Sequence, residues 1–203
     1  MENSKISDWL MRARLGDANA REQLFGACRS FVAVMARIHL HRRLQGKVDP
    51  SDLVQQSMLE AHRGLVEFHG QTTEEWLAWL KQIVQHNAVD MDRHYRGANR
   101  RDLRKERSMS ITNSYGSLVE WSPVDPGPSP SQVYSKAEKE LKVAAAIEEL
   151  PDDYRQVILL RNIERLPFEL VAERMERTRG ACQMLWMRAV EQLRSQLNDE
   201  TSI

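Results

Sequence analysis

Hydrophobic residues recur at intervals of three and four positions in both halves of the chain. One apolar stripe runs over residues 24–38 and another over residues 54–68. This spacing places the apolar side chains on one face of an α-helix. No segment shows the strict alternation of apolar and polar residues that is typical of a half-buried strand. The pattern therefore predicts an all-α fold.

Capping residues mark where these helices begin. Asp17 precedes the first stripe, and Asp49 followed by Pro50 precedes the second. Asp favours the N-cap position because its carboxylate accepts a free backbone N–H, and Pro favours the first helical position. After a turn at residues 69–73, a third helix begins near Trp76 and continues into a basic run.

A change of composition divides the helical pattern in two. Residues 108–131 contain four prolines, two glycines and seven serines. Such a composition breaks both helical and strand periods and is typical of a linker. We therefore expect two small helical domains joined by a flexible linker. The predicted divisions are an N-terminal segment at 1–16, a helical bundle at 17–107, the linker at 108–134 and a second helical domain at 135–198.

The C-terminal block has the outline of a helix-turn-helix. Short helices are expected after Pro151 and Pro167, and Thr178 is a natural N-cap for a longer last helix. Two helices joined by a short turn, the second one capped, match the arrangement that places a recognition helix in the DNA major groove. The inward face of the last helix carries Cys182, Trp186, Ala189 and Leu193. The residues that we expect to face DNA are Arg179, Gln183, Met184, Met187 and Arg188.

Positive charge is concentrated in one segment of a chain that is neutral overall. The 29 Lys and Arg residues balance the 29 Asp and Glu residues, yet residues 93–107 hold seven Lys or Arg against two acids. Because phosphate contacts supply much of the affinity of DNA-binding proteins, we expect this segment to contact DNA. A solvated charged face is the alternative. The predicted contacts are Arg93, Arg96, Arg100, Arg101, Arg104 and Lys105.

Several classes of function are disfavoured by what the sequence lacks. It contains no nucleotide-binding glycine loop, no HExxH zinc motif and no GxSxG nucleophile motif, so we expect no enzyme activity, no cofactor and no metal site. The two cysteines lack metal-ligand spacing and are expected to be reduced. No apolar run is long enough to span a membrane, and no signal peptide is evident. We expect a cytoplasmic protein with no membrane insertion.

Three segments resemble a known family in the family's own order. Residues 49–70 (DPSDLVQQSMLEAHRGLVEFHG) resemble the polymerase-binding part of region 2 in the extracytoplasmic-function group of sigma-70 factors. Residues 76–96 (WLAWLKQIVQHNAVDMDRHYR) resemble the promoter-melting part, and residues 149–194 resemble region 4. The resemblance covers most of the chain outside the predicted linker. It implies a sigma factor that binds core RNA polymerase and directs promoter recognition and transcription initiation.

The resemblance also implies particular contacts. The segment from Asn87 to Lys105 corresponds to the part that opens the promoter, so Asn87 joins the predicted DNA-binding residues. Promoter DNA and core polymerase are the implied partners, and an anti-sigma factor is a further candidate. The residues implied to grip the coiled coil of the largest polymerase subunit are Asp52, Leu53, Val54, Gln55 and Gln56.

Two other readings of the residues remain open. The chain would be a helical adaptor if the methionines of its last helix bind another protein instead of DNA. It would be an ordinary regulator if the helix-turn-helix acts in a homodimer. Co-purification with core polymerase separates the sigma factor from both alternatives.

Overall fold

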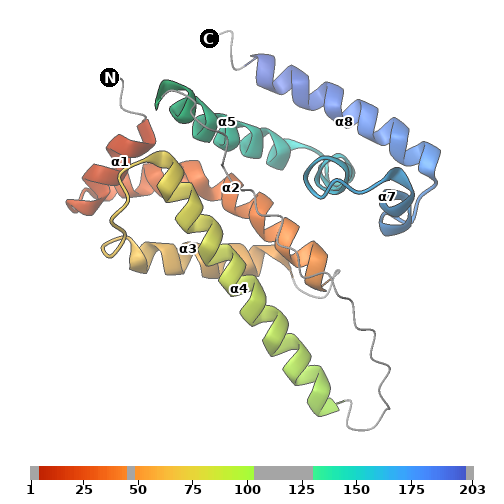
Figure 1. Ribbon diagram of the computed structural model, residues 1–203, viewed down its shortest axis with the longest axis horizontal. Coiled ribbons are helices and arrows are strands. Elements are labelled where there is room, and N and C mark those ends of the chain that lie inside the picture. The colour runs from red at the N-terminus through yellow and green to blue at the C-terminus, as the bar shows by residue number, and fades with distance from the viewer. Residues whose placement is uncertain (1–4, 45–48, 103–129, 200–203) are drawn as a thin grey trace.

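All the regular elements in the described part of the chain are helices (Figure 1). The computed structural model describes residues 5–44, 49–102 and 130–199. The prediction of an all-α protein with two helical domains is confirmed. None of the helices in these ranges is long and apolar enough to cross a membrane. The helices are α1 (Lys5–Arg14), α2 (Ala18–Leu44), α3 (Pro50–Gly64), α4 (Thr73–Asp102), α5 (Pro130–Glu149), α6 (Asp152–Ile158), α7 (Phe168–Arg174) and α8 (Arg179–Asp199), and a π-helical turn at Leu159–Ile163 follows α6.

Helices α2, α3 and α4 begin where capping side chains satisfy free backbone N–H groups. Asp49 Oδ1 accepts a hydrogen bond from Ser51 N at 2.8 Å, and Asp17 Oδ1 accepts one from Ala20 N at 3.0 Å. Both caps were expected from the sequence and are confirmed. At the start of α4, Thr72 and Glu75 bond reciprocally: Thr72 Oγ1 accepts from Glu75 N at 3.2 Å, and Glu75 Oε2 accepts from Thr72 N at 3.1 Å.

The N-terminal bundle is organised around α2, which packs against α1, α3 and α4. At its centre Trp76 is fully buried and makes edge contacts with Phe25 and Phe68, with ring centroids 5.7 and 5.3 Å apart. Trp76 Nε1 donates a hydrogen bond to Cys28 Sγ at 3.2 Å, so the polar atom of the indole keeps a partner inside the core. The bundle therefore holds the start of α4 firmly against α2 and α3.

In the C-terminal part of the chain, α6 and α7 pack against α8. Cys182 and Ala189 are fully buried, as the sequence predicted for the inward face of α8. Trp186 packs its ring on Phe168 with centroids 5.8 Å apart, and its Nε1 donates to Asn162 Oδ1 at 2.8 Å. This hydrogen bond fixes α8 to the π-helical turn.

Helix α5 links the two helical bodies. It packs against α2 and α4 on one side and against α6 and α8 on the other (Figure 1). Arg37 of α2 forms an ion pair with Glu148 of α5, with Nε 3.1 Å from Oε1. The helix begins at Pro130, earlier than the predicted domain start at residue 135, and residues 103–129 of the predicted linker lie outside the described residues.

Candidate nucleic-acid and protein interfaces

The polar face of α3 is the first candidate interface. Asp52, Gln55 and Gln56 are exposed on it, close to the Asp49 cap that begins the helix. Leu53 and Val54 are buried in the bundle core, so they hold α3 in place and offer little surface to a partner. Of the five residues that the resemblance assigns to polymerase binding, three are therefore available at the surface.

A hydrogen-bond network joins α3 to α4 beneath this face. The Asn87 side chain is 5% exposed and accepts a hydrogen bond from Gln56 Nε2 at 3.1 Å. Its Nδ2 donates to Ser57 Oγ at 3.3 Å and to Glu60 Oε2 at 2.8 Å. Asn87 was expected to contact DNA; in the structure its amide is bonded inside the protein, and a contact of Asn87 with DNA stays a prediction. The role of Glu60 could not be predicted from the sequence, because its hydrogen bond with Asn87 depends on the packing of α3 against α4.

The turn between α3 and α4 is held in place by one side chain from α1 and one from α4. Arg14 of α1 donates hydrogen bonds to the backbone carbonyls of Phe68 and Gly70. The carboxylate of Glu75 accepts hydrogen bonds from Gln71 N and Thr72 N. These bonds hold the pKa of Glu75 below its ordinary value. Arg14 therefore anchors the start of α4, the candidate promoter-opening helix, to α1. The charged carboxylate of Glu75 caps the same end of the helix.

Two tryptophans follow this turn on α4. Trp76 is fully buried and is not accessible to a base. Trp79 is half-buried, with its ring centroid 5.1 Å from that of Trp76. A Cβ on Gly64 would lie 3.0 Å from Trp79 Cζ2, so the glycine lets the indole approach α3 closely.

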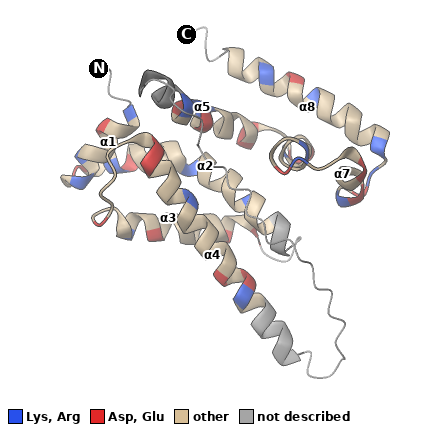
Figure 2. Ribbon diagram, viewed as in Figure 1, with Lys and Arg blue, Asp and Glu red and all other residues tan. Residues whose placement is uncertain are grey.

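Helix α4 continues through Asp102 and so includes the beginning of the basic run. Both acidic and basic residues are spread along α4 (Figure 2). The Arg93 side chain is exposed and pairs with Asp90, with Nη1 3.2 Å from Oδ1. An exposed pair at this spacing is weak and leaves the arginine free to exchange partners. The side chains of the other predicted contacts, Arg96, Arg100, Arg101, Arg104 and Lys105, lie outside the described residues, so their role stays a prediction.

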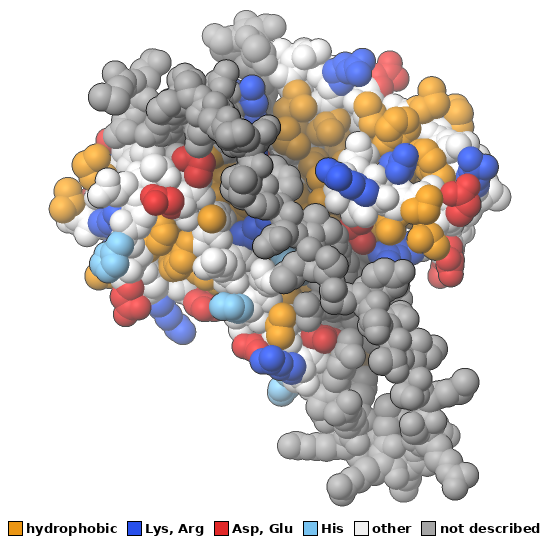
Figure 3. Space-filling view, in the orientation of Figure 1, with side chains coloured by type: hydrophobic (Ala, Val, Ile, Leu, Met, Phe, Trp, Pro, Cys, Tyr) orange, Lys and Arg blue, Asp and Glu red, His pale blue; other side chains and the backbone are white. Residues whose placement is uncertain are grey.

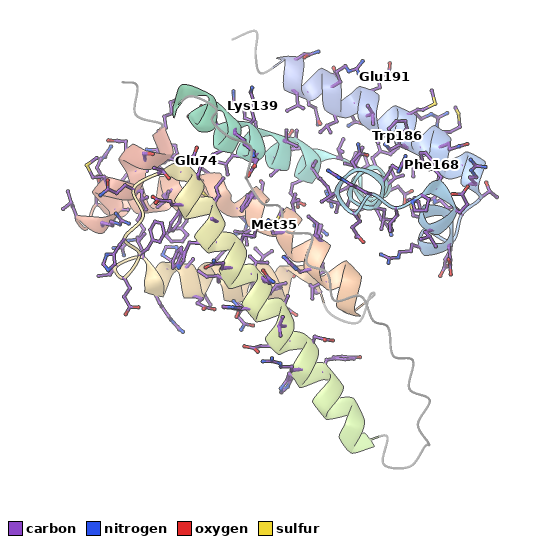
Figure 4. All side chains as sticks on the ribbon, in the orientation of Figure 1. Met35, Glu74, Lys139, Phe168, Trp186 and Glu191 are labelled. Carbon is purple, nitrogen blue, oxygen red and sulfur yellow. The ribbon has the colours of Figure 1, made fainter. Side chains whose placement is uncertain are left out.

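The helix-turn-helix is formed by α7 and α8. Glu176 adopts a left-handed backbone with φ of 53° in the turn, and Thr178 Oγ1 accepts a hydrogen bond from Ala181 N at 3.2 Å. The predicted Thr178 cap is confirmed. Across the helices, Arg179 pairs with Glu169, with Nε 3.1 Å from Oε1. Figure 4 places Phe168 and Trp186 at the junction between the two helices.

The outward face of α8 is partly apolar. Met184 is 52% exposed and Met187 is 57% exposed, whereas Gln183 is half-buried beside them. Arg188 is exposed on the same helix. Hydrophobic side chains lie next to Lys and Arg on the surface over α7 and α8 (Figure 3). This face offers both a side-chain amide for a base edge and methyl groups for apolar contact.

Neither cysteine is poised for chemistry. Burial raises the pKa of the Cys28 thiol to about 12, although the hydrogen bond from Trp76 opposes this shift. Burial also raises the pKa of Cys182. Both thiols are free and buried. Within the part of the chain that the structure describes, no group of three or more His, Cys, Asp or Glu side chains is arranged to hold a metal ion.

The chain is similar to known transcription proteins over most of its length. The sequence profile of the family described as "Sigma-70, region 4" matches residues 140–193. The ECF RNA polymerase sigma-E factor of Haemophilus influenzae is 27% identical over 187 residues, which cover 92% of each chain. The ECF RNA polymerase sigma factor SigE of Mycolicibacterium smegmatis is 26% identical over 161 residues, 79% of this chain and 56% of that relative.

Among solved structures, the flagellar complex of Sigma-28 and FlgM matches 91% of this chain and 98% of its own, with 19% identity and a TM-score of 0.37. The family profile covers the second half of α5, all of α6 and α7 and most of α8, and the similarity to the sigma-E relative extends over 92% of the chain. Over most of its length the chain is therefore similar to RNA polymerase sigma factors of the extracytoplasmic-function group, and residues 140–193 match region 4 of the sigma-70 family.

Proposed function

We propose that this sigma factor docks on core RNA polymerase through the polar face of α3, opens the downstream promoter element with α4 and reads the upstream element with α8. The mechanism is delivery and melting without covalent chemistry. The observation that carries the proposal is the exposed set Asp52, Gln55 and Gln56, located in the segment that resembles the polymerase-binding part of the family. An anti-sigma factor, the third partner implied by the resemblance, remains a prediction.

The polar face is suited to docking because it is held rigid before binding. Gln56 is tied to the buried Asn87, and Ser57 and Glu60 complete the link from α3 to α4. A preorganised face loses less side-chain entropy on association than a mobile one. Because the same network connects α3 to α4, polymerase bound on α3 would also orient the helix that is proposed to open DNA.

Charge reversal on α3 tests the docking step. We expect Asp52→Lys to lower affinity for core polymerase by about tenfold or more, which corresponds to about 1.4 kcal/mol. Glu67→Lys is the matched control, since Glu67 is exposed beyond the end of α3 and undergoes the same change of charge. Because Asp52 lies in the first turn of α3, circular dichroism must show that both variants stay folded. Equal affinities for Asp52→Lys and the parent would refute the assignment.

Selection from a randomised upstream promoter element tests α8. Gln183→Ala should relax preference at one base pair by roughly 1 to 3 kcal/mol, because a side-chain amide can bond twice to adenine. Arg188→Ala should weaken binding to all sequences alike if the arginine holds a phosphate, and should lower the slope of log affinity against log salt by about one. Unchanged selection and affinity in both variants would remove α8 from DNA readout.

The exposed methionines favour one alternative for this helix. Met184 and Met187 offer flexible apolar surface of the kind found at adaptable protein interfaces. An adaptor role would predict that Met184→Asp abolishes binding of a protein partner and leaves promoter selection unchanged. The same promoter-selection experiment therefore decides between DNA and protein recognition by α8.

A further inference from the structure

One face of α5 lies on the N-terminal bundle. Glu148 on this face accepts two hydrogen bonds from Arg37 of α2, with Nε 3.1 Å from Oε1 and Nη2 3.3 Å from Oε2. Steps of four, three and four residues place the following side chains on that face: Ala137, Leu141, Ala144 and Glu148. Ala137 and Ala144 are buried, and Leu141 is half-buried. The contact is therefore lined mainly by small side chains and ends in an ion pair.

The same helix is fixed to the C-terminal helices by Arg155 of α6. The side chain of Arg155 is 13% exposed, and it donates hydrogen bonds to the backbone carbonyls of Ile147, Glu148 and Leu150 at 3.3, 2.6 and 2.8 Å. Its Nε also lies 3.8 Å from Oε1 of Glu148. These bonds close the corner between α5 and α6, so α5 moves together with the C-terminal helices.

The contact between α5 and the bundle is of a kind that can separate. Its buried alanines, Ala137 and Ala144, remove less apolar surface from water than the leucines and isoleucines of a domain core. Near the other end of the contact, burial raises the pKa of Glu140, and the charges of Lys81 and Glu74 on α4 also act on this carboxyl group. Small side chains between charged groups are typical of an interface between domains that move relative to each other.

This contact sets the position of α8 relative to α4. Both helices pack against α5 (Figure 1), and packed helices lie about 8 to 10 Å apart, so the nearest parts of α4 and α8 are within about 20 Å. Two sites on the same side of duplex DNA are at least one helical turn apart, about 34 Å. The chain over residues 103–129 extends to at most about 90 Å, so the covalent connection does not impose the closeness. The contact of α5 with α2 and α4 imposes it.

We propose that α5 is an intramolecular clamp, and that α4 and α8 engage the two promoter elements together only after Arg37 and Glu148 separate. The polar face of α3 is exposed while the clamp is closed, so docking on polymerase and opening of the clamp are separate steps. The closed form itself does not depend on the proposed function. The effect of the clamp on promoter binding rests on that function.

Energy transfer between two dyes measures closure in the free protein. One dye is attached through Glu67→Cys, at an exposed position beyond α3, and the other through Ser195→Cys, at an exposed position of α8. The native thiols of Cys28 and Cys182 are buried and should not react with the dyes. Transfer between the two dyes therefore reports whether the C-terminal helices rest on the bundle.

Two substitutions open the clamp from opposite sides. Arg37→Ala removes the link from α2 and leaves Glu148 beside Arg155, and Glu148→Gln removes the acceptor charge on α5. We expect each to raise the open population at least about threefold, seen as lower transfer. Glu149→Gln is the matched control, since Glu149 is the exposed neighbour of Glu148 and should leave transfer unchanged. Circular dichroism checks that every variant keeps its helices.

Salt gives a readout that a purely structural contact would not move. The side chains of Arg37 and Glu148 are 34% and 19% exposed, so dissolved ions screen their attraction. Transfer in the parent should fall as salt rises from about 0.05 to 0.5 M, whereas transfer in Arg37→Ala should stay constant. A parent that shows no dependence on salt, with transfer unchanged in both variants, overturns the clamp.

The rate of promoter-complex formation tests the consequence of opening. With core polymerase in excess, holoenzyme carrying Arg37→Ala or Glu148→Gln should form promoter complexes at least about threefold faster than holoenzyme with the parent or with Glu149→Gln. The two substitutions change the net charge in opposite directions, so a shared acceleration does not arise from charge.

The two measurements separate the clamp from the proposed function. Lower transfer and faster complex formation in both variants support the inference. Lower transfer with unchanged rates overturns the role of the clamp in promoter binding and leaves the proposed function standing. If holoenzyme with the parent forms no promoter complex, the proposed function fails together with that role, and transfer in the free protein alone decides whether the clamp exists.

Discussion

Replacing Asn87 by alanine separates a structural role from a DNA contact at this position. The change removes the acceptor for Gln56 and the donor for Ser57 and Glu60 in one step. Because all three partners belong to α3, the substitution should loosen α3 from α4. A residue whose role was to hold the unpaired promoter strand would instead affect DNA binding and leave the fold unchanged.

The expected cost follows from which partners can return to water. Gln56 and Glu60 are exposed and can be rehydrated, whereas Ser57 is 1% exposed and loses its partner inside the protein. A buried polar group left without its partner costs about 1 to 3 kcal/mol. We expect a net loss of about 2 kcal/mol, which for a chain of this length lowers the melting temperature by about 4 to 8 °C.

Thermal unfolding followed by circular dichroism measures this cost. His86→Ala is the control, since His86 is the exposed neighbour on the same helix and its loss should change stability by less than about 0.5 kcal/mol. A melting temperature of Asn87→Ala equal to that of the parent, together with altered base preference in the holoenzyme, would refute the structural assignment and restore Asn87 as a DNA contact.

Three further predictions concern local features of the fold. Arg165 adopts φ of 56°, so Arg165→Gly should relieve a strain of about 1 to 2 kcal/mol and raise the melting temperature; a lower value would contradict this. With the pKa of Cys28 raised to about 12 and both thiols buried, native protein at about pH 8 should react with a thiol reagent only as fast as it unfolds, whereas rapid labelling without denaturant would show an open core. The Asp49 pKa is lowered by hydrogen bonds from Ser51, so the cap stabilises the fold at pH above the ordinary value of 3.8 and is lost as pH falls through the lowered value. Asp49→Ala should therefore melt below the parent at neutral pH, with the difference shrinking at about pH 3, and a difference that does not depend on pH would exclude the charged cap.

Features that depend on neighbouring residues could be predicted from the sequence. The caps at Asp17, Asp49 and Thr178 act over two or three residues, and all three are present in the structure. The apolar stripe that includes Cys28 is likewise buried, because helical periodicity alone decides which face meets the core. Helix α1 was missed, although Ile6 and its partners at spacings of four and three form a short apolar stripe.

Features that depend on distant residues could not be predicted. Asn87 is a polar residue in a helix, and only the approach of α3, about 30 positions earlier, shows that it is buried and bonded. Arg37 and Glu148 pair across 111 positions, so the packing of α5 on α2 left no local signal.

A sigma factor gives core RNA polymerase its promoters. Sequencing the 5′ ends of transcripts made on genomic DNA by core polymerase, with and without the protein, measures this role. We expect discrete new start sites that share a two-part upstream sequence and appear only when the protein is present. If the same set of transcripts formed with and without the protein, the chain would not act as a sigma factor.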